Sequence, residues 1–418
     1  MGTLQDGGTM DFSTEITYSA EQEQFRKEVS TWLDANAQIP PEFEIPRETG
    51  DMSEGLYKWV REYRKKLGSK GWLAPLWPSE YGGGGLSVDR AQVLEEELSK
   101  RKIPAVYDNR LAAPAMMVWG TEEQKQRFLP LINKGDVITW QAFTEPEVGS
   151  DAASITTSAI RDGDDFIING TKVYIGGPFS ADYIWTTAVT DQTSPRHRNL
   201  GAFYVPADLP GISFSDMELI VNVGKRFVYY DNVRVPGEYL VGGENQGWQV
   251  AQTSLEIEHG AGGSIGEGAS RDGGVLAALR EYAATAVDGA GNRLIEDSRI
   301  RDLLVEARIE THIVELIALR NYWMFNNQKR MTFHGSQNSL MRKLLAMKLG
   351  NIVLEVAGPY AMLDDAAWAP SNGALESHQR QAITAHHPGG SSEIQKLIMA
   401  RRLGLSRSKE EAAPTKVA

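Results

Sequence analysis

The spacing of the hydrophobic residues changes twice along this chain of 418 residues, and that change limits the possible folds more than any other feature. From residue 18 to about 135 apolar residues recur at the helical period, then they alternate to about 245, and then the helical period returns. We therefore predict an all-α domain at 18–135, a β-domain at 136–245 and a second all-α domain at 246–405. The last residues, 406–418, are predicted to be a disordered tail.

The first region contains four helix starts with capping residues. The caps are Ser19, Ser53, Ser87 and Thr121. The glycine run YGGGGLS at 81–87 fits neither a dinucleotide-binding nor a Walker pattern, so we interpret it as a flexible loop before a capped helix.

The second region has period two, with turn residues at short intervals. In DDFIINGTKVYIGG the pair Asn169-Gly170 separates two apolar runs, which predicts a hairpin turn. We expect a compact antiparallel domain of about a hundred residues.

The third region contains long, apolar helical segments at 297–328 and 335–363. Helices of this length bury faces against each other, which favours a four-helix bundle. Four-helix bundles often hold di-iron sites, but these need two Glu-x-x-His motifs. His312 has Glu310 two residues before it and Glu315 three residues after it, but no pair of Glu-x-x-His motifs is present. Adjacent His386 and His387 are poorly placed to share one ion, so we expect no metal.

Composition excludes several classes of function. There is no cysteine, which rules out thiolate chemistry and disulfides and fits a cytoplasmic location. A net charge of −12 without a basic patch argues against nucleic acid as a partner. No run of 18 apolar residues exists, so no membrane span is expected, and the N-terminus lacks the features of a secretory signal.

Two turns are rich in glycine and hydroxyl side chains. One is QAFTEPEVGSD at 141–151, which could present donors to a planar polar ligand or be an ordinary turn. The other is the GGSS turn at 389–392, which opens directly into a helix and carries no acid, base or nucleophile.

Five motifs, in this order, resemble the acyl-CoA dehydrogenase family, and the resemblance covers residues 18–407. The motifs are GWLAPLWPSEYGGGGLS, GTEEQKQRFLPLINKG, TEPEVGSD, DNVRVPGEYLVGGENQGW and GGSSEIQKLIMARRLGL. The resemblance implies an N-terminal helical domain, a middle β-barrel and a C-terminal four-helix bundle, assembled as a tetramer. It implies FAD between the β-domain and the bundle, with part of the site from a neighbouring subunit.

The implied reaction is α,β-dehydrogenation of an acyl-CoA thioester to a trans-2-enoyl-CoA. A glutamate removes the α-proton, a hydride passes to flavin N5, and electron-transfer flavoprotein is the expected acceptor. By the same resemblance, eight residues bind the cofactor. They are Phe143, Thr144, Gly149, Ser150, Tyr174, Gly176, Ser391 and Glu393.

The glutamate that opens the closing motif in many family members is Gly389 here. A minority of the family places the base on the first helix of the bundle, and the matching residue is Glu258. Leu255 and Glu258 share an apolar face of that helix, whereas Glu256 points about 200° away on the 3.6-residue period. We therefore assign Glu258 as the base. By the same resemblance, the backbone N–H of Gly389 donates a hydrogen bond to the thioester carbonyl.

Three positions depart from the family pattern. Tyr174-Ile175-Gly176 replaces Trp-Ile-Thr, and His259 replaces an arginine after the base. Residues 285–297 lack the partner-subunit motif, an arginine followed by an aromatic residue and later a glutamine, whose arginine neutralises the FAD pyrophosphate. These losses leave open a working homotetramer, the catalytic half of a heterotetramer of the kind found in steroid side-chain catabolism, and a non-catalytic subunit. An oxygen-using flavoenzyme is a further alternative. The space at Gly389 hints at a bulky or branched acyl chain.

Overall fold

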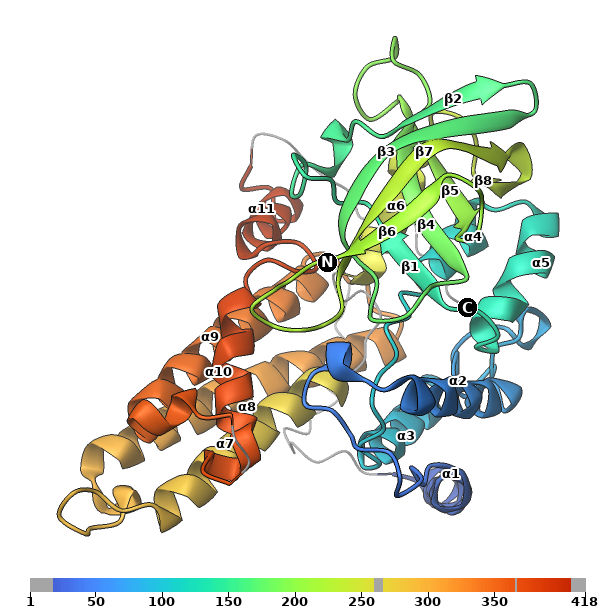
Figure 1. Ribbon diagram of the computed structural model, residues 1–418. Helices are drawn as coiled ribbons and strands as arrows, with labels where there is room; N and C mark the ends of the chain where they lie inside the picture. The colour runs from blue at the N-terminus through green and yellow to red at the C-terminus, as the bar shows by residue number, and fades with distance from the viewer. Residues whose placement is uncertain (1–17, 259–265, 365–366, 407–418) are drawn as a thin grey trace, which may run out of the picture.

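The protein is described from a computed structural model that covers residues 18–258, 266–364 and 367–406 (Figure 1). Helices of the N-terminal region lie beside a twisted sheet, and a bundle of long helices extends away from both. The sequence-predicted order of helices, strands and helices is confirmed.

From residue 18 onwards the N-terminal region contains five α-helices, and a side-chain cap begins each of them except α4. These are α1 Ala20–Asn36, α2 Glu54–Ser69, α3 Val88–Ser99, α4 Ala112–Trp119 and α5 Glu122–Asn133, with short 3-10 turns η1 Thr49–Asp51 and η2 Ser79–Tyr81. Ser19, Ser53, Ser87 and Thr121 each accept a backbone N–H from the first helical turn, as predicted.

The glycine run is more tightly packed than the predicted flexible loop. A Cβ at Gly83 would lie 2.2 Å from the carbonyl oxygen of Trp77, and one at Gly84 would lie 2.7 Å from that of Gly71. The run therefore consists of glycine because backbone passes against backbone there.

The sheet is mixed rather than wholly antiparallel. Its strands are β1 Thr139–Ala142, β2 Ser158–Asp162, β3 Asp165–Ile175, β4 Tyr183–Val189, β5 Leu200–Pro206, β6 Ile212–Asp216, β7 Arg226–Pro236 and β8 Leu240–Val241. They follow the order β6-β7-β3-β2-β4-β5-β8, with β1 added to β4. Both β1 and β2 run parallel to β4 and follow one another along it, since Ala142 at the end of β1 pairs with Thr186 and Ser158 at the start of β2 pairs with Val189. The predicted antiparallel domain is wrong in this respect.

The hairpin predicted at Asn169-Gly170 is also wrong. Strand β3 continues through this pair, and its register against β7 shifts between Ile168 and Gly170. Gly170 has φ +153°, and its Cα faces Thr157, whose Oγ1 would lie 2.4 Å from a Cβ. The pair thus forms a bulge, and the real turn between β2 and β3 lies at Gly163, with φ +66°.

Four helices of the C-terminal region surround one hydrophobic core that includes Leu279, Leu349, Val353 and Leu375. The helices and 3-10 turns of this region are α6 Gly247–Glu256, α7 Gly266–Thr285, η6 Leu294–Glu296, α8 Ser298–Asn326, α9 His334–Ala357, η7 Gly358–Met362, η8 Pro370–Gly373, α10 Ala374–Thr384 and α11 Ser392–Arg402. The four are α7 to α10, and α11 packs on α9.

Two helices differ in extent or position from the expectation. Helix α9 ends at Ala357 instead of reaching residue 363, because Gly358 takes a conformation with φ +55° and ψ −136° that only glycine adopts easily. Helix α6 packs against α4, β5 and β4, so it connects the β-domain to the N-terminal helices.

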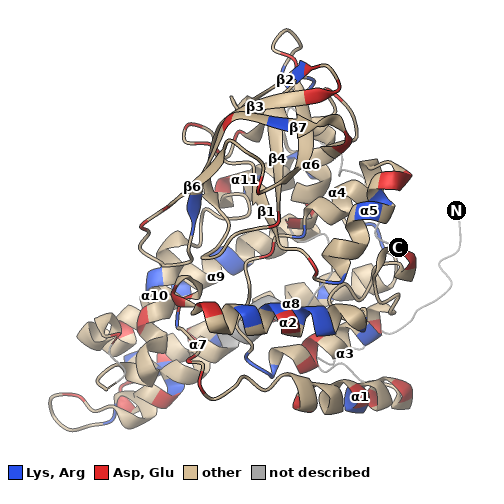
Figure 2. Cartoon of the chain, turned by 45° about the vertical axis from the view of Figure 1, so that its right-hand side comes forward, with Lys and Arg blue, Asp and Glu red and all other residues tan. Residues whose placement is uncertain are grey.

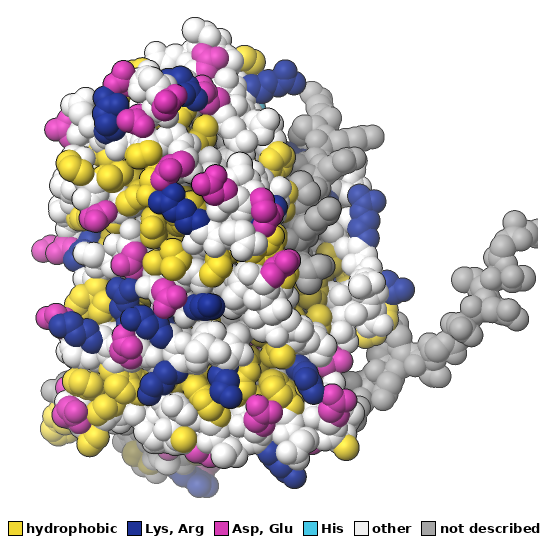
Figure 3. Space-filling view, turned by 90° about the vertical axis from the view of Figure 1, so that its right-hand side faces the viewer, with side chains coloured by type: hydrophobic (Ala, Val, Ile, Leu, Met, Phe, Trp, Pro, Cys, Tyr) yellow, Lys and Arg dark blue, Asp and Glu magenta, His cyan; other side chains and the backbone are white. Residues whose placement is uncertain are grey.

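Basic and acidic residues are interspersed along the helices and strands (Figure 2). On the face seen in Figure 3, hydrophobic patches alternate with charged side chains. No helix in the described part of the chain is long and apolar enough to cross a membrane.

Candidate active site

Helix α6 holds Glu258 just beyond its C-terminal end, and three hydrogen bonds fix that end. The indole N–H of Trp119 donates to Thr253 Oγ1 at 3.0 Å, and that of Trp185 donates to Ser254 Oγ at 3.1 Å. Ser254 Oγ in turn donates to the carbonyl of Leu111 at 2.7 Å. The helix is therefore anchored to both the sheet and α4 next to the glutamate.

Glu258 is half-buried, and its carboxylate accepts a hydrogen bond from Gln141 Nε2 at 3.1 Å. Burial raises the pKa of Glu258 above its ordinary value; the Gln141 hydrogen bond and the charges of Lys343 and Lys225 offset only part of that rise. The result is a carboxylate that takes up a proton more readily than an exposed glutamate does.

The carboxylate lies beside the glycine turn. A Cβ added to Gly389, which has φ +64°, would lie 3.8 Å from Glu258 Oε1. The turn is held by Gln395 Nε2, which donates to the carbonyl of Gly389 at 2.9 Å, and by Lys343 Nζ, which donates to the carbonyl of Pro388. The side-chain positions of residues 258 and 389 therefore meet, one from the end of α6 and the other from the turn before α11.

Glu256 points elsewhere, as the helical period predicts. Its carboxylate pairs with Arg402, which also donates to the carbonyl of Thr332 at 2.9 Å. Glu256 thus ties α6 to α11, while Glu258 is left to face the turn. His259 and the residues after it, up to 265, lie outside the described part of the chain.

In the TEPEVGSD turn the glutamate has a structural role that the sequence did not indicate. Glu145 is buried and pairs with Lys172 Nζ at 2.9 Å, and it also accepts backbone N–H groups from Thr156 at 2.6 Å and Thr157 at 3.0 Å. Lys172 further donates to the carbonyl of Thr187 at 2.9 Å. This buried pair fixes the turn against β3 and β4.

The pair brings several predicted cofactor residues together. Phe143 is buried, and the carbonyl of Thr144 accepts the N–H of Val173 at 2.9 Å, so Thr144 lies beside the end of β3. There the ring of Tyr174 is 55% exposed, and the backbone has φ +61°. An exposed aromatic ring next to a half-buried hydroxyl fits a planar ligand.

Gly176 does not offer a polar contact, and the structure explains why it is glycine. It has φ +72°, and a Cβ there would lie 2.4 Å from carbons of the Trp140 ring. Trp140 is buried in the core of the sheet. A threonine at this position would therefore displace the indole.

The remaining predicted cofactor residues differ in exposure and in hydrogen bonding. Ser150 is exposed, and Gly149 has open space where a side chain would stand. Ser391 caps α11 by accepting the N–H of Ile394 at 3.3 Å, so its hydroxyl has a structural partner. The Glu393 side chain is 74% exposed in the first turn of α11.

Two buried acceptors at the site have no partner among the described residues. They are Gln141 Oε1 and Gln395 Oε1, one beside Glu258 and the other beside Gly389. An unpaired buried acceptor costs free energy, so both positions favour a bound ligand that donates hydrogen bonds. Together with the exposed ring of Tyr174, these two acceptors fit a planar ligand that carries N–H donors, as a flavin does.

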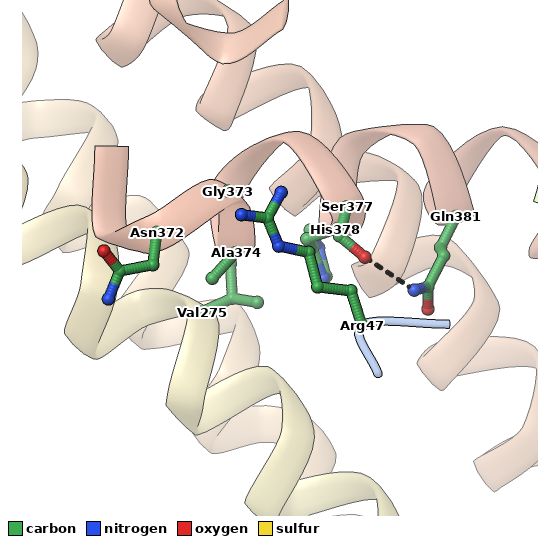
Figure 4. Close-up of a pocket in the computed structure, with 8 residues that line it drawn as sticks. All are labelled: Arg47, Val275, Asn372, Gly373, Ala374, Ser377, His378 and Gln381. Atoms are coloured by element: carbon green, nitrogen blue, oxygen red, sulfur yellow. Dashed lines mark hydrogen bonds between the residues drawn. The ribbon is translucent and has the colours of Figure 1, made fainter. Parts of the chain in front are cut away.

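A separate cavity of about 280 Å³ lies at the N-terminal end of α10 (Figure 4). Gly389 comes after the C-terminal end of the same helix. Arg47 reaches into the cavity from the N-terminal region, and Gln381 Nε2 donates to Ser377 Oγ at 2.9 Å. None of the predicted site residues lines it. Among the described residues, no group of three or more potential ligands could hold a metal ion, and His312 pairs with Glu315 at 3.1 Å.

Comparison with known proteins identifies relatives over nearly the whole chain. Family profiles for the acyl-CoA dehydrogenase N-terminal, middle and C-terminal domains match residues 19–136, 141–229 and 245–404. Acyl-CoA dehydrogenase FadE26 of Mycobacterium tuberculosis is 30% identical over 409 residues, covering 94% of this chain and 99% of that protein.

Two solved structures are similar throughout. The ChsE4–ChsE5 complex of Mycobacterium tuberculosis matches with a TM-score of 0.76 and 27% identity, covering 94% of this chain and 100% of that chain. The Tcur3481–Tcur3483 steroid ACAD matches with a TM-score of 0.78 and 29% identity, covering 95% and 100%.

Proposed function

The chain belongs to the acyl-CoA dehydrogenase family of oxidoreductases, which act on the CH–CH group of acyl-CoA, and from this premise we propose that it is an FAD-dependent dehydrogenase with Glu258 as its base. The substrate is an acyl-CoA thioester and the product a trans-2-enoyl-CoA. The observation that carries the proposal is the position of the Glu258 carboxylate, directly beside Gly389.

Glu258 takes the α-proton of the thioester. Its raised pKa suits this step, because a general base works best when its pKa lies near the pH of the solution. Gln141 orients the carboxylate through one oxygen, and the other oxygen faces the turn. The backbone N–H of Gly389 is the proposed donor to the thioester oxygen, where negative charge grows as the proton leaves.

Bound FAD would accept the hydride from Cβ. We propose that Phe143, Thr144, Gly149, Ser150 and Tyr174 hold it from the β-domain side. Ser391 and Glu393 then act from the start of α11, where Ser391 contributes through its backbone because its hydroxyl caps the helix. Gly176 contributes only by letting the chain pass Trp140 closely.

We further propose that this chain is the base-bearing half of a heteromer. The segment at 285–297, which should carry the arginine motif for the FAD pyrophosphate, instead forms a tight loop closed by a bridge between Val287 and Arg293. The guanidinium of Arg293 pairs with Glu296 at 2.9 Å. The ChsE4–ChsE5 and Tcur3481–Tcur3483 proteins are each described as two different chains, and the latter as a steroid ACAD. A bulky steroid acyl group would use the space that Gly389 leaves, and electron-transfer flavoprotein would reoxidise the flavin.

The test is the FAD content and oligomeric mass of the protein, purified alone and co-expressed with a paralogue from a neighbouring gene, followed by anaerobic addition of acyl-CoAs. We expect little flavin alone, about one flavin per complete site in the heteromer, and bleaching by a branched or steroid acyl-CoA. Full flavin content in a homotetramer would refute the heteromer but keep the enzyme. No flavin in either form would refute the dehydrogenase, and rapid reoxidation by air would indicate an oxidase.

A further inference from the structure

Two lysines face Glu258 from different elements. Lys343 belongs to α9, and Lys225 immediately precedes β7. The charge of each acts on Glu258, and that of Glu258 acts on each of them. Neither amino group forms an ion pair with a carboxylate of the described residues, so two basic side chains share the site with the Glu258 carboxylate.

The two lysines differ in what they contact. Lys343 Nζ donates to the carbonyls of Ala385 and Pro388, which fix it to the turn before Gly389. Lys225 Nζ lies 3.4 Å from the centroid of the Tyr107 ring and donates to no oxygen of the described residues. An ammonium has three donors, so Lys225 keeps all of its hydrogen-bonding capacity for a ligand.

The Tyr107 ring holds the Lys225 ammonium in place without neutralising it. A cation over an aromatic face is stabilised by the ring quadrupole, yet it remains a net charge. Burial lowers the pKa of Lys225 to about 7, with the Glu258 charge opposing the fall, which reflects the cost of a cation that lacks a partner. An anion bound at Lys225 would remove that cost.

We propose that Lys225, resting on Tyr107, binds a carboxylate on the acyl part of the substrate, so that the enzyme prefers acyl-CoAs whose acyl group is itself anionic. This inference rests on the proposed function, because it places the acyl group beside Glu258. The phosphates of CoA are the other source of anions. They lie at the far end of the pantetheine arm, whereas Lys225 and Glu258 are close enough to shift each other's pKa.

The test uses pairs of acyl-CoA analogues of equal chain length, with about four to seven atoms in the acyl chain. One member of each pair ends in a carboxylate and the other in a methyl group. In each, sulfur replaces Cβ, so no hydride can leave and binding is measured without turnover. Isothermal titration of the holoenzyme should show about tenfold tighter binding of the carboxylate member for at least one length, the usual worth of a charge-assisted hydrogen bond.

Variants test whether Lys225 causes the preference for the carboxylate analogue. Lys225→Met should abolish it, Lys225→Arg should retain it, and Lys343→Met, which removes the other cation near Glu258, should leave it in place. Equal binding of both members at every length would overturn the proposal, and so would an equal loss of both in Lys225→Met, which would assign the ammonium to CoA. A Lys225-dependent preference in a protein whose flavin no acyl-CoA reduces would instead refute the dehydrogenase alone.

Discussion

Glu145 and Glu258 are both glutamates withdrawn from solvent beside the same sheet, and burial has opposite results for them. Burial alone would raise the pKa of Glu145, but the charge of Lys172 and hydrogen bonds from Thr156 and Thr157 lower it to about 2. From the described residues Glu258 receives one hydrogen bond, from Gln141, and its pKa remains raised. The charge of Lys172 and the additional donors, not burial, therefore separate a carboxylate that stays ionised from one that can exchange a proton.

The pH dependence of stability follows with opposite signs. The depressed pKa of Glu145 contributes stability above the unfolded value near 4.5, and this is lost as pH falls towards 2. The raised pKa of Glu258 has the reverse effect, since the folded state takes up its proton first and is relatively favoured on mild acidification. Acid unfolding should therefore begin at the Glu145 turn.

The strongest test of the comparison is Glu145→Gln, which leaves Lys172 buried without its counter-charge. We expect a loss of about 3–5 kcal/mol in the free energy of unfolding, measured by denaturant titration. The double variant Glu145→Gln/Lys172→Met should recover much of that loss, because no buried charge remains. A single variant as stable as the parent would show that the pair does not hold the turn.

The next largest effect is expected for Glu258→Gln, which keeps the shape and removes the base. Turnover should fall at least about a hundredfold while FAD content and melting temperature stay near those of the parent. Glu256→Gln is the matched control on the same helix, since an amide oxygen can still accept from Arg402, and its turnover should be retained. Undiminished turnover in Glu258→Gln would disprove the assignment of the base.

A smaller effect is expected when a second carboxylate joins the first. In Gly389→Glu the new side chain begins 3.8 Å from Glu258 Oε1, so two like charges would share one site and the acid limb of kcat/KM should move to higher pH. The positive φ of residue 389 adds a cost of about 1 kcal/mol to stability. Combined with Glu258→Gln, the new glutamate should restore part of the turnover. No recovery would mean that the two positions are not equivalent.

The smallest effect is expected for Gln141→Leu, which removes the hydrogen bond to the Glu258 carboxylate. The base works in its ionised form, so kcat/KM falls as pH drops through its pKa, and losing the donor should raise that pKa further by about one unit. The pH profile of kcat/KM measures the shift. An unchanged acid limb would assign that limb to a group other than Glu258.

Local features of the fold were predictable from the sequence. The helix cap at Ser19 and the length of α8 are examples, because both are determined by residues close together in the chain. The errors arose where a distant contact overrides a local pattern, as at Gly170, which is a bulge against Thr157 rather than a turn. The direction of Glu258 followed from helical spacing. Its neighbours Gln141 and Lys225 did not, because no periodicity relates them to it.

The surroundings of Glu258 have a consequence for biosynthesis. They come from Tyr107, Gln141, Lys225, Lys343 and Gly389, segments spread over most of the chain. Contacts of such long sequence separation form late, because long loops must close first. During translation the sheet and the N-terminal helices can pack early, but the last wall of the site is added only when the final helices have left the ribosome. Enzymatic competence should thus be the final property the growing protein acquires, after its compactness.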